Sequence, residues 1–227
     1  MRVSRSGVLA LLFVARLAQS ADLGQFTQPQ MTSGLKDTLR EAAVNAIGNL
    51  GRSDGFLGNP KVRIPLPGPL EKAQSLLKAV GMGKQADELI VAMNRAAEAA
   101  VPQAKPLVVD AVKHMTVADA KGILTGGDDA VTQYFRSHTQ SPLHAKFLPI
   151  VSAATEKVGL AQKYNQLAGK ASQLGMLDSS QATVQEYVTQ KTLDGLYLMM
   201  AEEEKKVRHN PLQASGDLAK KIFGALR

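Results

Sequence analysis

"SDGFLGNPKVRIPLPGPLEKA", residues 53–73, separates two strongly helical stretches and decides how the fold must be built. It holds four prolines and three glycines, so neither flanking helix can continue through it. Asp54-Gly55 and Asn59-Pro60 are turn signals within it. The stretch is therefore either a linker between two domains or an ordered part of one domain.

An alternation of apolar residues favours the ordered interpretation. Val62, Ile64 and Leu66 recur at every second position, so one edge of an extended chain here is apolar. Two prolines within the run lack backbone N–H groups and exclude a central position in a sheet. We expect residues 53–68 to form an extended strap across helices, with its apolar edge inward and its prolines lowering the entropic cost of order.

The composition indicates helices rather than sheets. Hydrophobic residues make up 44% of the chain and aromatic residues only 4%, and the apolar residues are mostly Ala, Leu, Val and Met, which suit packed helices. Gaps between the helical tracts are short, which favours antiparallel neighbours. The predicted fold class is all-α, a single compact bundle of about nine to ten helices. The tracts with helical spacing are 33–50, 69–80, 84–101, 107–115, 116–124, 130–138, 141–158, 161–175, 183–209 and 215–226.

Capping signals set several expected helix boundaries. They are Ser33, Thr116 with Asp119, Asp128 or Asp129, Ser141 followed by Pro142, and Thr183 with Glu186. Pro149 lies inside the tract that Ser141 would begin, so we expect it to kink or split that helix.

The first 20 residues have the pattern of a signal peptide. Arg2 and Arg5 form a basic start, residues 7–15 are an apolar run too short to span a bilayer, and residues 18–20 are suited to cleavage between Ser20 and Ala21. The alternative is an amphipathic N-terminal helix, which a charge at Arg16 favours. With cleavage, 21–31 would be a flexible mature N-terminus and 32–227 a single helical domain.

The net charge and the cysteine content limit which classes of partner and which cellular location we expect. Removing the leader removes three arginines, so the formal net charge falls from +7 to +4. The remaining charges are spread out and aromatics are scarce, which excludes a typical nucleic-acid surface and leaves weak attraction to anionic membranes. The signal-peptide pattern predicts a periplasmic protein, and because the chain has no cysteine to acylate, we expect that it is not a lipoprotein. No later run is apolar enough to span a membrane, and the oligomeric state stays open.

Motifs for metal, cofactor or nucleophilic chemistry are missing. The four histidines never recur at i,i+4, and neither an HExxH pattern nor a GxSxG elbow occurs. We therefore predict no metal and no cofactor.

Six landmarks, taken in order, resemble one family. They are "DGF..NPKVRIPLP" (54–67), "MNRAAEAA" (93–100), "MTVADAKGILTGG" (115–127), "FLPIV" (147–151), "YVTQKTLDGLY" (187–197) and "AEEEKKVRHNP" (201–211). This order is similar to that of the bacterial domain-of-unknown-function family 4197. The resemblance implies an exported helical protein, often a lipoprotein in that family, and implies no reaction. The lack of a cysteine to acylate departs from the lipoprotein pattern.

The landmark at 93–100 carries the first candidate ligand-binding residues. Asn94, Arg95 and Glu98 lie beside an alanine-rich face and could form the polar wall of a cleft, with Asn94 and Glu98 four residues apart. Asp54, Asn59 and Asp194 could face them. The alternative is tight helix packing with a polar edge.

The landmark at 201–211 carries the others. Three successive glutamates point in different directions around a helix and cannot form one cluster. Either Glu203 or Arg208 turns inward to hold the proline-rich stretch or a ligand, or the segment is a solvated helix end. In the second case Glu204 would pair with Arg208 and Glu202 with Lys206.

Three functions remain open. The first is a non-catalytic exported binding or interaction module of the cell envelope, whose partner is an unknown envelope protein. The second is a hydrolase-like enzyme with a polar cleft near Asn94, Arg95 and Glu98. The third is a periplasmic carrier of a lipid or other hydrophobic small molecule, which requires an enclosed apolar cavity of several hundred Å3.

Overall fold

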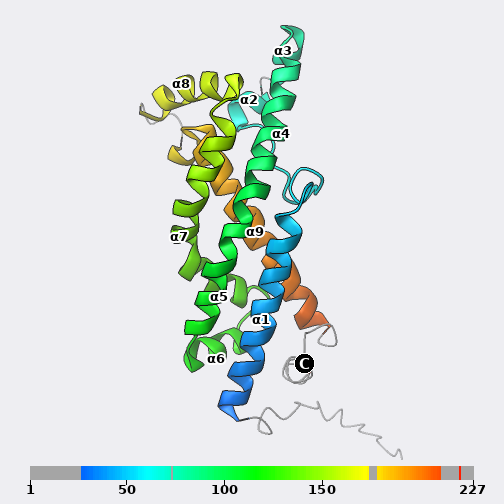
Figure 1. Ribbon diagram of the computed structural model, residues 1–227, viewed down its shortest axis with the longest axis vertical. Helices are drawn as coiled ribbons and strands as arrows, with labels where there is room; N and C mark the ends of the chain where they lie inside the picture. The colour runs from blue at the N-terminus through cyan, green and yellow to red at the C-terminus, as the bar shows by residue number, and fades with distance from the viewer. Residues whose placement is uncertain (1–26, 73, 174–177, 211–219, 221–227) are drawn as a thin grey trace, which may run out of the picture.

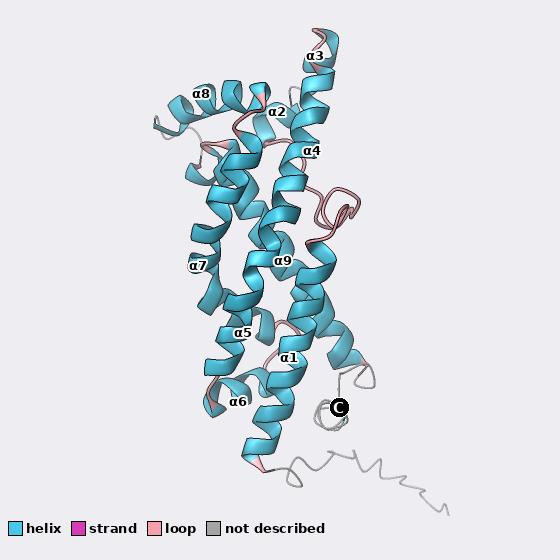
Figure 2. Cartoon of the chain, in the orientation of Figure 1, coloured by secondary structure: helices cyan, strands magenta, loops and turns pink. Residues whose placement is uncertain are grey.

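The computed structural model describes residues 27–72, 74–173, 178–210 and 220 of the 227-residue chain. Within these ranges the regular structure is entirely helical, as predicted, and Figure 2 draws no strand. The helices are α1 (Gln28–Leu50), α2 (Gly68–Lys72), α3 (Gln74–Ala79), α4 (Gly83–Ala100), α5 (Ala104–His114), α6 (Val117–Thr125), α7 (Ala130–Thr155), α8 (Gly159–Gln173) and α9 (Val184–His209), with 3-10 turns η2 (Val101–Gln103) and η3 (Ser179–Gln181).

The long helices run alternately up and down an elongated bundle (Figure 1). α1 runs one way, α4 and α5 return, α7 runs parallel to α1, and α9 returns again. Only the η2 turn, which contains Pro102, separates α4 from α5. The short helix α6 lies at one end and α8 crosses the other. Neighbouring helices are thus antiparallel with short connections, as expected for a bundle.

The core is organised by a stripe on α7 in which every fourth residue is inward. Its members are Phe135, Thr139, Leu143, Phe147, Val151 and Thr155, and each is 0–1% exposed. The hydroxyl groups of Thr139 and Tyr197 are 2.8 Å apart and join α7 to α9. Small alanines on α4 allow close packing against this stripe.

The expected break before Ser141 is wrong, because α7 continues through both Pro142 and Pro149. A proline removes one helical hydrogen bond and commonly ends or kinks a helix. Here buried Phe135, Leu143 and Val151 lie before, between and after the two prolines, on the same face. Burial of this face offsets the lost hydrogen bonds and keeps one helix.

The other boundaries follow the sequence to different extents. Thr116 and Asp119 form the reciprocal capping box that was predicted. Thr183 accepts the N–H of Glu186, but the Glu186 carboxylate binds Nε2 of His144 at 2.9 Å. α1 begins at Gln28, before Ser33, so residues 28–31 of the segment expected to be flexible are helical.

Over the tract expected as one helix, 69–80, α2 and α3 are helical on either side of residue 73, which lies outside the described residues. Leu70 and Leu77 of the expected inward face pack half-buried against the core, but the face is not inward along its whole length. Leu76 is 65% exposed and Val80 is 60% exposed. α3 packs on α4 at the end of the bundle. No second helix among the described residues covers its opposite face, which leaves these side chains in solvent.

The proline-rich segment, residues 53–68, is not helical before Gly68, and it packs closely on the bundle. Its side chains Phe56, Val62, Ile64 and Leu66 are each at most 6% exposed. A methyl group at Gly195 of α9 would lie 2.8 Å from Cε1 of Phe56. Gly195 therefore gives the segment room to approach the helix backbone.

Gly195→Ala should destabilise the protein by about 1–2 kcal/mol, because the clash with Phe56 exceeds the gain in helix propensity. Urea unfolding measures this change. The matched control is Gly122→Ala in α6, where an added methyl group meets no atom within 4 Å and a small stabilisation is expected. Equal stability of both variants would contradict the close approach.

Candidate functional site

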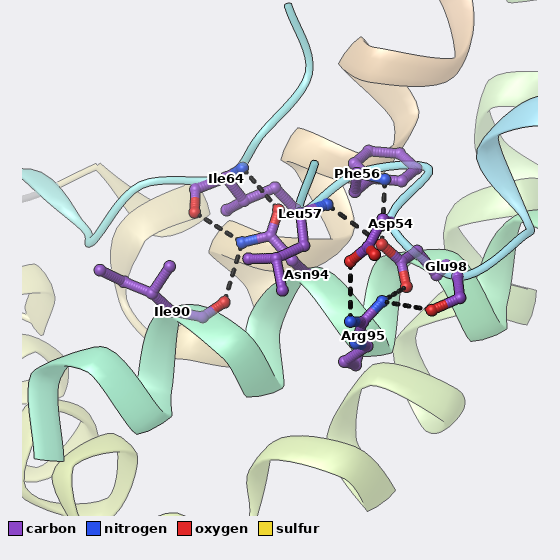
Figure 3. Close-up of polar contacts among 9 residues, drawn as sticks. Asp54, Phe56, Leu57, Ile64, Ile90, Asn94, Arg95 and Glu98 are labelled. Atoms are coloured by element: carbon purple, nitrogen blue, oxygen red, sulfur yellow. Dashed lines mark hydrogen bonds and ion pairs between the residues drawn. The ribbon is translucent and has the colours of Figure 1, made fainter. Parts of the chain in front are cut away.

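Asn94, Arg95 and Glu98 of α4 meet the proline-rich segment, and we call these three residues the α4 clamp (Figure 3). Their positions on one side of the helix follow from the three- and four-residue spacing of α-helical neighbours. Asp54 reaches the clamp from the segment. Four of the eight predicted site residues therefore come together in space.

Glu98 holds the first turn of the segment by its backbone. One carboxylate oxygen, Oε1, accepts the N–H groups of Phe56 and Leu57, both at 3.0 Å. The other, Oε2, accepts Nη1 of Arg95 at 2.6 Å. The side chain is only 6% exposed, so these charge-assisted hydrogen bonds replace the water that the carboxylate has lost.

Arg95 binds the same turn of the segment on the solvent-exposed side of the α4 clamp. It donates through Nη1 to Oγ of Ser53 at 3.1 Å and through Nη2 to Oδ1 of Asp54 at 2.8 Å. Its hydrogen bonds to Glu98 and Asp54 raise the pKa of its guanidinium above the usual value. Asp54 has a φ of 63°, in the left-handed region that Asp tolerates better than most residues.

Asn94 holds the extended part of the segment as a peptide group of a neighbouring strand would. Its Oδ1 accepts the N–H of Ile64 at 2.8 Å, and its Nδ2 donates to the carbonyl of Ile64 at 2.9 Å. Nδ2 also donates to the carbonyl of Ile90 at 2.8 Å. Both amide hydrogens are thus used, and the side chain is fully buried.

Two further predicted residues make their contacts outside the α4 clamp, and Asn59 also places Nδ2 4.0 Å from Sδ of Met199 on α9. Asn59 accepts the N–H of Lys61 through its side chain at 3.1 Å and shapes the turn that it was predicted to form. Asp194 accepts Nε2 of Gln190, four residues earlier in α9, at 2.9 Å. Neither side chain hydrogen-bonds to the α4 clamp.

At the landmark over 201–211 the inward glutamate is Glu204, not Glu203. Glu203 pairs with Lys206 at 2.6 Å near the surface, and Glu202 pairs with Lys61 rather than with Lys206. Glu204 lies four residues after the buried Met200, so the helical period of the core already placed it inward. Three consecutive glutamates at 202–204 made it unclear from the sequence which of them follows this period.

Glu204 and Arg208 join three helices. Glu204 accepts the N–H groups of Val131 and Thr132 at 2.9 and 3.0 Å and so caps α7, because Asp129, one of the two expected caps, makes no capping hydrogen bond with its side chain. Burial raises the pKa of the Glu204 carboxyl, and these hydrogen bonds oppose the rise. Arg208 binds Glu204 at 3.1 Å, as predicted, and the carbonyl of Ile123 at 2.8 Å.

The α4 clamp and the pair of Glu204 and Arg208, which we call the Glu204 cluster, lie apart in the structure. Glu204 lies nine residues beyond Gly195, which is the part of α9 next to the proline-rich segment. At the helical rise this corresponds to roughly 14 Å along α9. The eight predicted residues therefore do not surround one site.

Two cavities are relevant to the proposed functions. An apolar cavity between α1, α7 and α9 has a volume of about 20 Å3. A groove open to solvent, of about 360 Å3, lies between the proline-rich segment and helices α2 to α4. We call it the strap groove. Its lining residues are Pro60, Arg63, Pro65, Leu66, Glu71, Gln74 and Ile90.

The strap groove contains a positively charged side chain, Arg63, that no other described residue pairs with. Arg63 is exposed, and its guanidinium makes no hydrogen bond or ion pair with another described residue. Nearby, Tyr187 lies behind the segment, with its hydroxyl 3.5 Å from the carbonyl of Leu66. Burial raises the pKa of Tyr187 to about 12, so this phenol stays protonated near neutral pH.

In the parts of the chain that the structure covers, no group of three or more His, Asp or Glu side chains is arranged to hold a metal ion. In those same ranges, none of the helices combines the length and the apolar character that crossing a bilayer would need.

Glu98→Ala should destabilise the protein by about 2–4 kcal/mol, because it leaves the N–H groups of Phe56 and Leu57 without their acceptor. Chemical denaturation measures the loss. Glu88→Ala, on the exposed face of the same helix, is the matched control and should change stability by less than about 0.5 kcal/mol. If both variants unfold at the same denaturant concentration, Glu98 does not anchor the segment.

Comparison with known proteins agrees with the landmarks. The model of a family described as "Protein of unknown function (DUF4197)" matches residues 25–224. The match covers both the α4 clamp and the Glu204 cluster. Neither the curated proteins nor the solved structures include a match to this chain. Because the family model spans most of the sequence, the chain belongs to the DUF4197 family.

Proposed function

We propose that this protein is a non-catalytic interaction module of the bacterial cell envelope that holds a segment of another envelope protein in the strap groove. The observation that carries the proposal is the contrast between two neighbouring sites. The polar groups of the α4 clamp are used to hold the chain itself, whereas the groove beside them is open and contains the unpartnered Arg63.

The geometry of the clamp favours binding over catalysis. A general base needs a carboxylate or imidazole within reach of a substrate proton. Both oxygens of Glu98 are occupied by backbone N–H groups and Arg95, and its side chain is almost fully buried. Asp54, Arg95 and Glu98 converge, but they line neither the apolar cavity nor the strap groove.

The apolar cavity gives little support to a carrier of lipids. Its volume of about 20 Å3 suits roughly one water molecule, whereas ligand pockets usually measure about 300–1,000 Å3. Met93 and Met200, which could have lined a larger pocket, are at most 5% exposed in the core.

The strap groove suits a short peptide segment. Leu66 and Ile90 offer apolar surface, while Arg63 and Glu71 can bind groups of opposite charge. The wall formed by the segment is already ordered, because Asn94 fixes the backbone at Ile64. A prearranged wall lowers the entropic cost of binding.

Export is part of the same proposal. The basic start, the short apolar run and the small residues before Ala21 support a cleaved leader and a periplasmic location. Residues 32–227 would then act as one helical domain.

We also propose that residues 53–68 act as a structural strap rather than a linker. Ile64→Asp should destabilise the protein by about 3 kcal/mol or more, because it places a charge without a partner in an apolar site. Thermal unfolding measures this. Arg63→Asp introduces the same group at the exposed neighbouring position and should leave the melting temperature nearly unchanged. A melting temperature unaffected by Ile64→Asp would restore the linker interpretation.

Partner binding can be tested with a photo-crosslinking amino acid at Gln74 in cells that naturally make the protein. We expect one discrete protein adduct, and we expect Arg63→Glu to reduce it at least tenfold because the charge at the groove is reversed. The matched control places the crosslinker at the exposed Lys163 of α8, where this adduct should not form. An adduct that persists in Arg63→Glu, or no adduct at Gln74, would contradict binding in the strap groove.

A further inference from the structure

A second surface, separate from the strap groove lining, lies at one end of the bundle. We call it the α3 tip and define it as residues 72 and 75–84, from the end of α2 through α3 to the start of α4. Figure 1 shows α3 and the start of α4 projecting beyond the other labelled helices at this end. The projection leaves the tip accessible from several sides.

The α3 tip carries the two most exposed large hydrophobic side chains of the described residues. Leu76 is 65% exposed and Val80 is 60% exposed. They are four residues apart and therefore lie on the same face, while Leu77 packs against the core cluster on the other side. Scattered single exposures need no explanation, but two adjacent ones on a projecting end suggest a contact surface.

The charged residues within the tip are all positive, and the nearest acidic residues in the sequence, Glu71, Asp87 and Glu88, lie just outside it. Lys72, Lys78 and Lys84 lie within the tip, and the sequence from 72 to 84 contains no Asp or Glu. Lys72 and Lys78 form no ion pair with a described residue, and Lys84 is 3.9 Å from Glu88. The surface thus combines apolar side chains with two cations, Lys72 and Lys78, that have no ion-pair partner among the described residues.

We propose that the α3 tip docks this protein onto an anionic phospholipid membrane surface. Leucine and valine side chains can enter the boundary between headgroups and acyl chains. The long lysine side chains can place their ammonium groups among lipid phosphates while their stems cover apolar surface. Charge complementarity selects this partner over a neutral membrane.

The shape of the tip also favours a membrane over a second folded protein. A stable protein interface usually buries more than about 1,000 Å2, which needs a broad complementary surface. A narrow projecting end offers less area, but it can insert a few side chains into a deformable lipid surface. End-on docking would leave the sides of the bundle, including the strap groove, accessible to a protein partner.

Vesicle co-sedimentation tests the proposal with the protein as its host produces it, its N-terminus established by intact mass. The probes are vesicles of phosphatidylglycerol and phosphatidylcholine in equal parts, and vesicles of phosphatidylcholine alone. We expect preferential binding to the anionic vesicles, which weakens as salt is added. Any retained leader is common to all variants, so only the differences between variants are interpreted.

Two sets of substitutions separate the apolar and ionic contributions. Leu76→Ser with Val80→Ser should lower partitioning onto anionic vesicles about tenfold. Lys72→Gln, Lys78→Gln and Lys84→Gln should each lower it about fivefold. The matched control combines Val117→Ser and Lys121→Gln on α6, at the opposite end of the bundle, and should leave partitioning unchanged. All of these positions are exposed, so a normal melting temperature is expected for each variant.

Three results would overturn the proposal. The first is equal binding to both kinds of vesicle, and the second is unchanged binding of the tip variants. The third is a dimer in sedimentation velocity that Leu76→Ser with Val80→Ser dissociates, since the tip would then bind a second copy. Arg63→Glu should keep vesicle binding, so failure of the strap-groove proposal and failure of this one are distinguishable.

Discussion

The carboxylate of Glu98 is the contact on which the arrangement of this protein depends. It accepts two backbone N–H groups from a turn that is more than 40 residues away in sequence and lies against α9. Without an acceptor these donors would be buried and unsatisfied, which is among the larger penalties that a fold can carry. The hydrogen bonds of Asn94 to Ile64 extend the same attachment along the proline-rich segment. A non-helical segment can therefore form part of a helical core.

Glu204 is a second buried glutamate that accepts backbone N–H groups from a distant part of the chain. It caps the first N–H groups of α7 and is itself held by Arg208, which also binds the carbonyl of Ile123. In both clusters a buried glutamate binds backbone donors and an arginine partner. A buried carboxylate is costly unless its oxygens are hydrogen-bonded, and this requirement favours one arrangement of the chain over others. The polar residues that first suggest chemistry are thereby explained as parts of the framework.

In the proposed function, partners bind to two surfaces that this framework holds in place. The strap groove borders the segment that Asn94 fixes, so its wall is set before any partner arrives. The α3 tip projects from the same end of the bundle and carries exposed Leu76 and Val80 among lysines. A module that docks on a membrane by its tip and binds a peptide beside its strap would have both surfaces at one end.

The helical class, the family and much of the local structure could be read from the sequence. Turn signals at Asn59 and the capping box at Thr116 depend on neighbouring residues, so they were predictable. The spacing of Asn94, Arg95 and Glu98 placed them on one side of a helix for the same reason. The resemblance then supplied the family, which the match over residues 25–224 confirms.

Only the tertiary structure decided what these residues contact. It kept α7 continuous through Pro142 and Pro149, because side chains on both sides of the prolines are buried against other helices. It also turned Glu204 inward rather than Glu203, and it left Leu76 in solvent although its spacing is that of a core residue. The sequence by itself determined the helices, the turns and the polar faces, since these depend on residues a few positions apart. Which face is buried, and which donor each carboxylate binds, depends on contacts between segments that are distant in the chain.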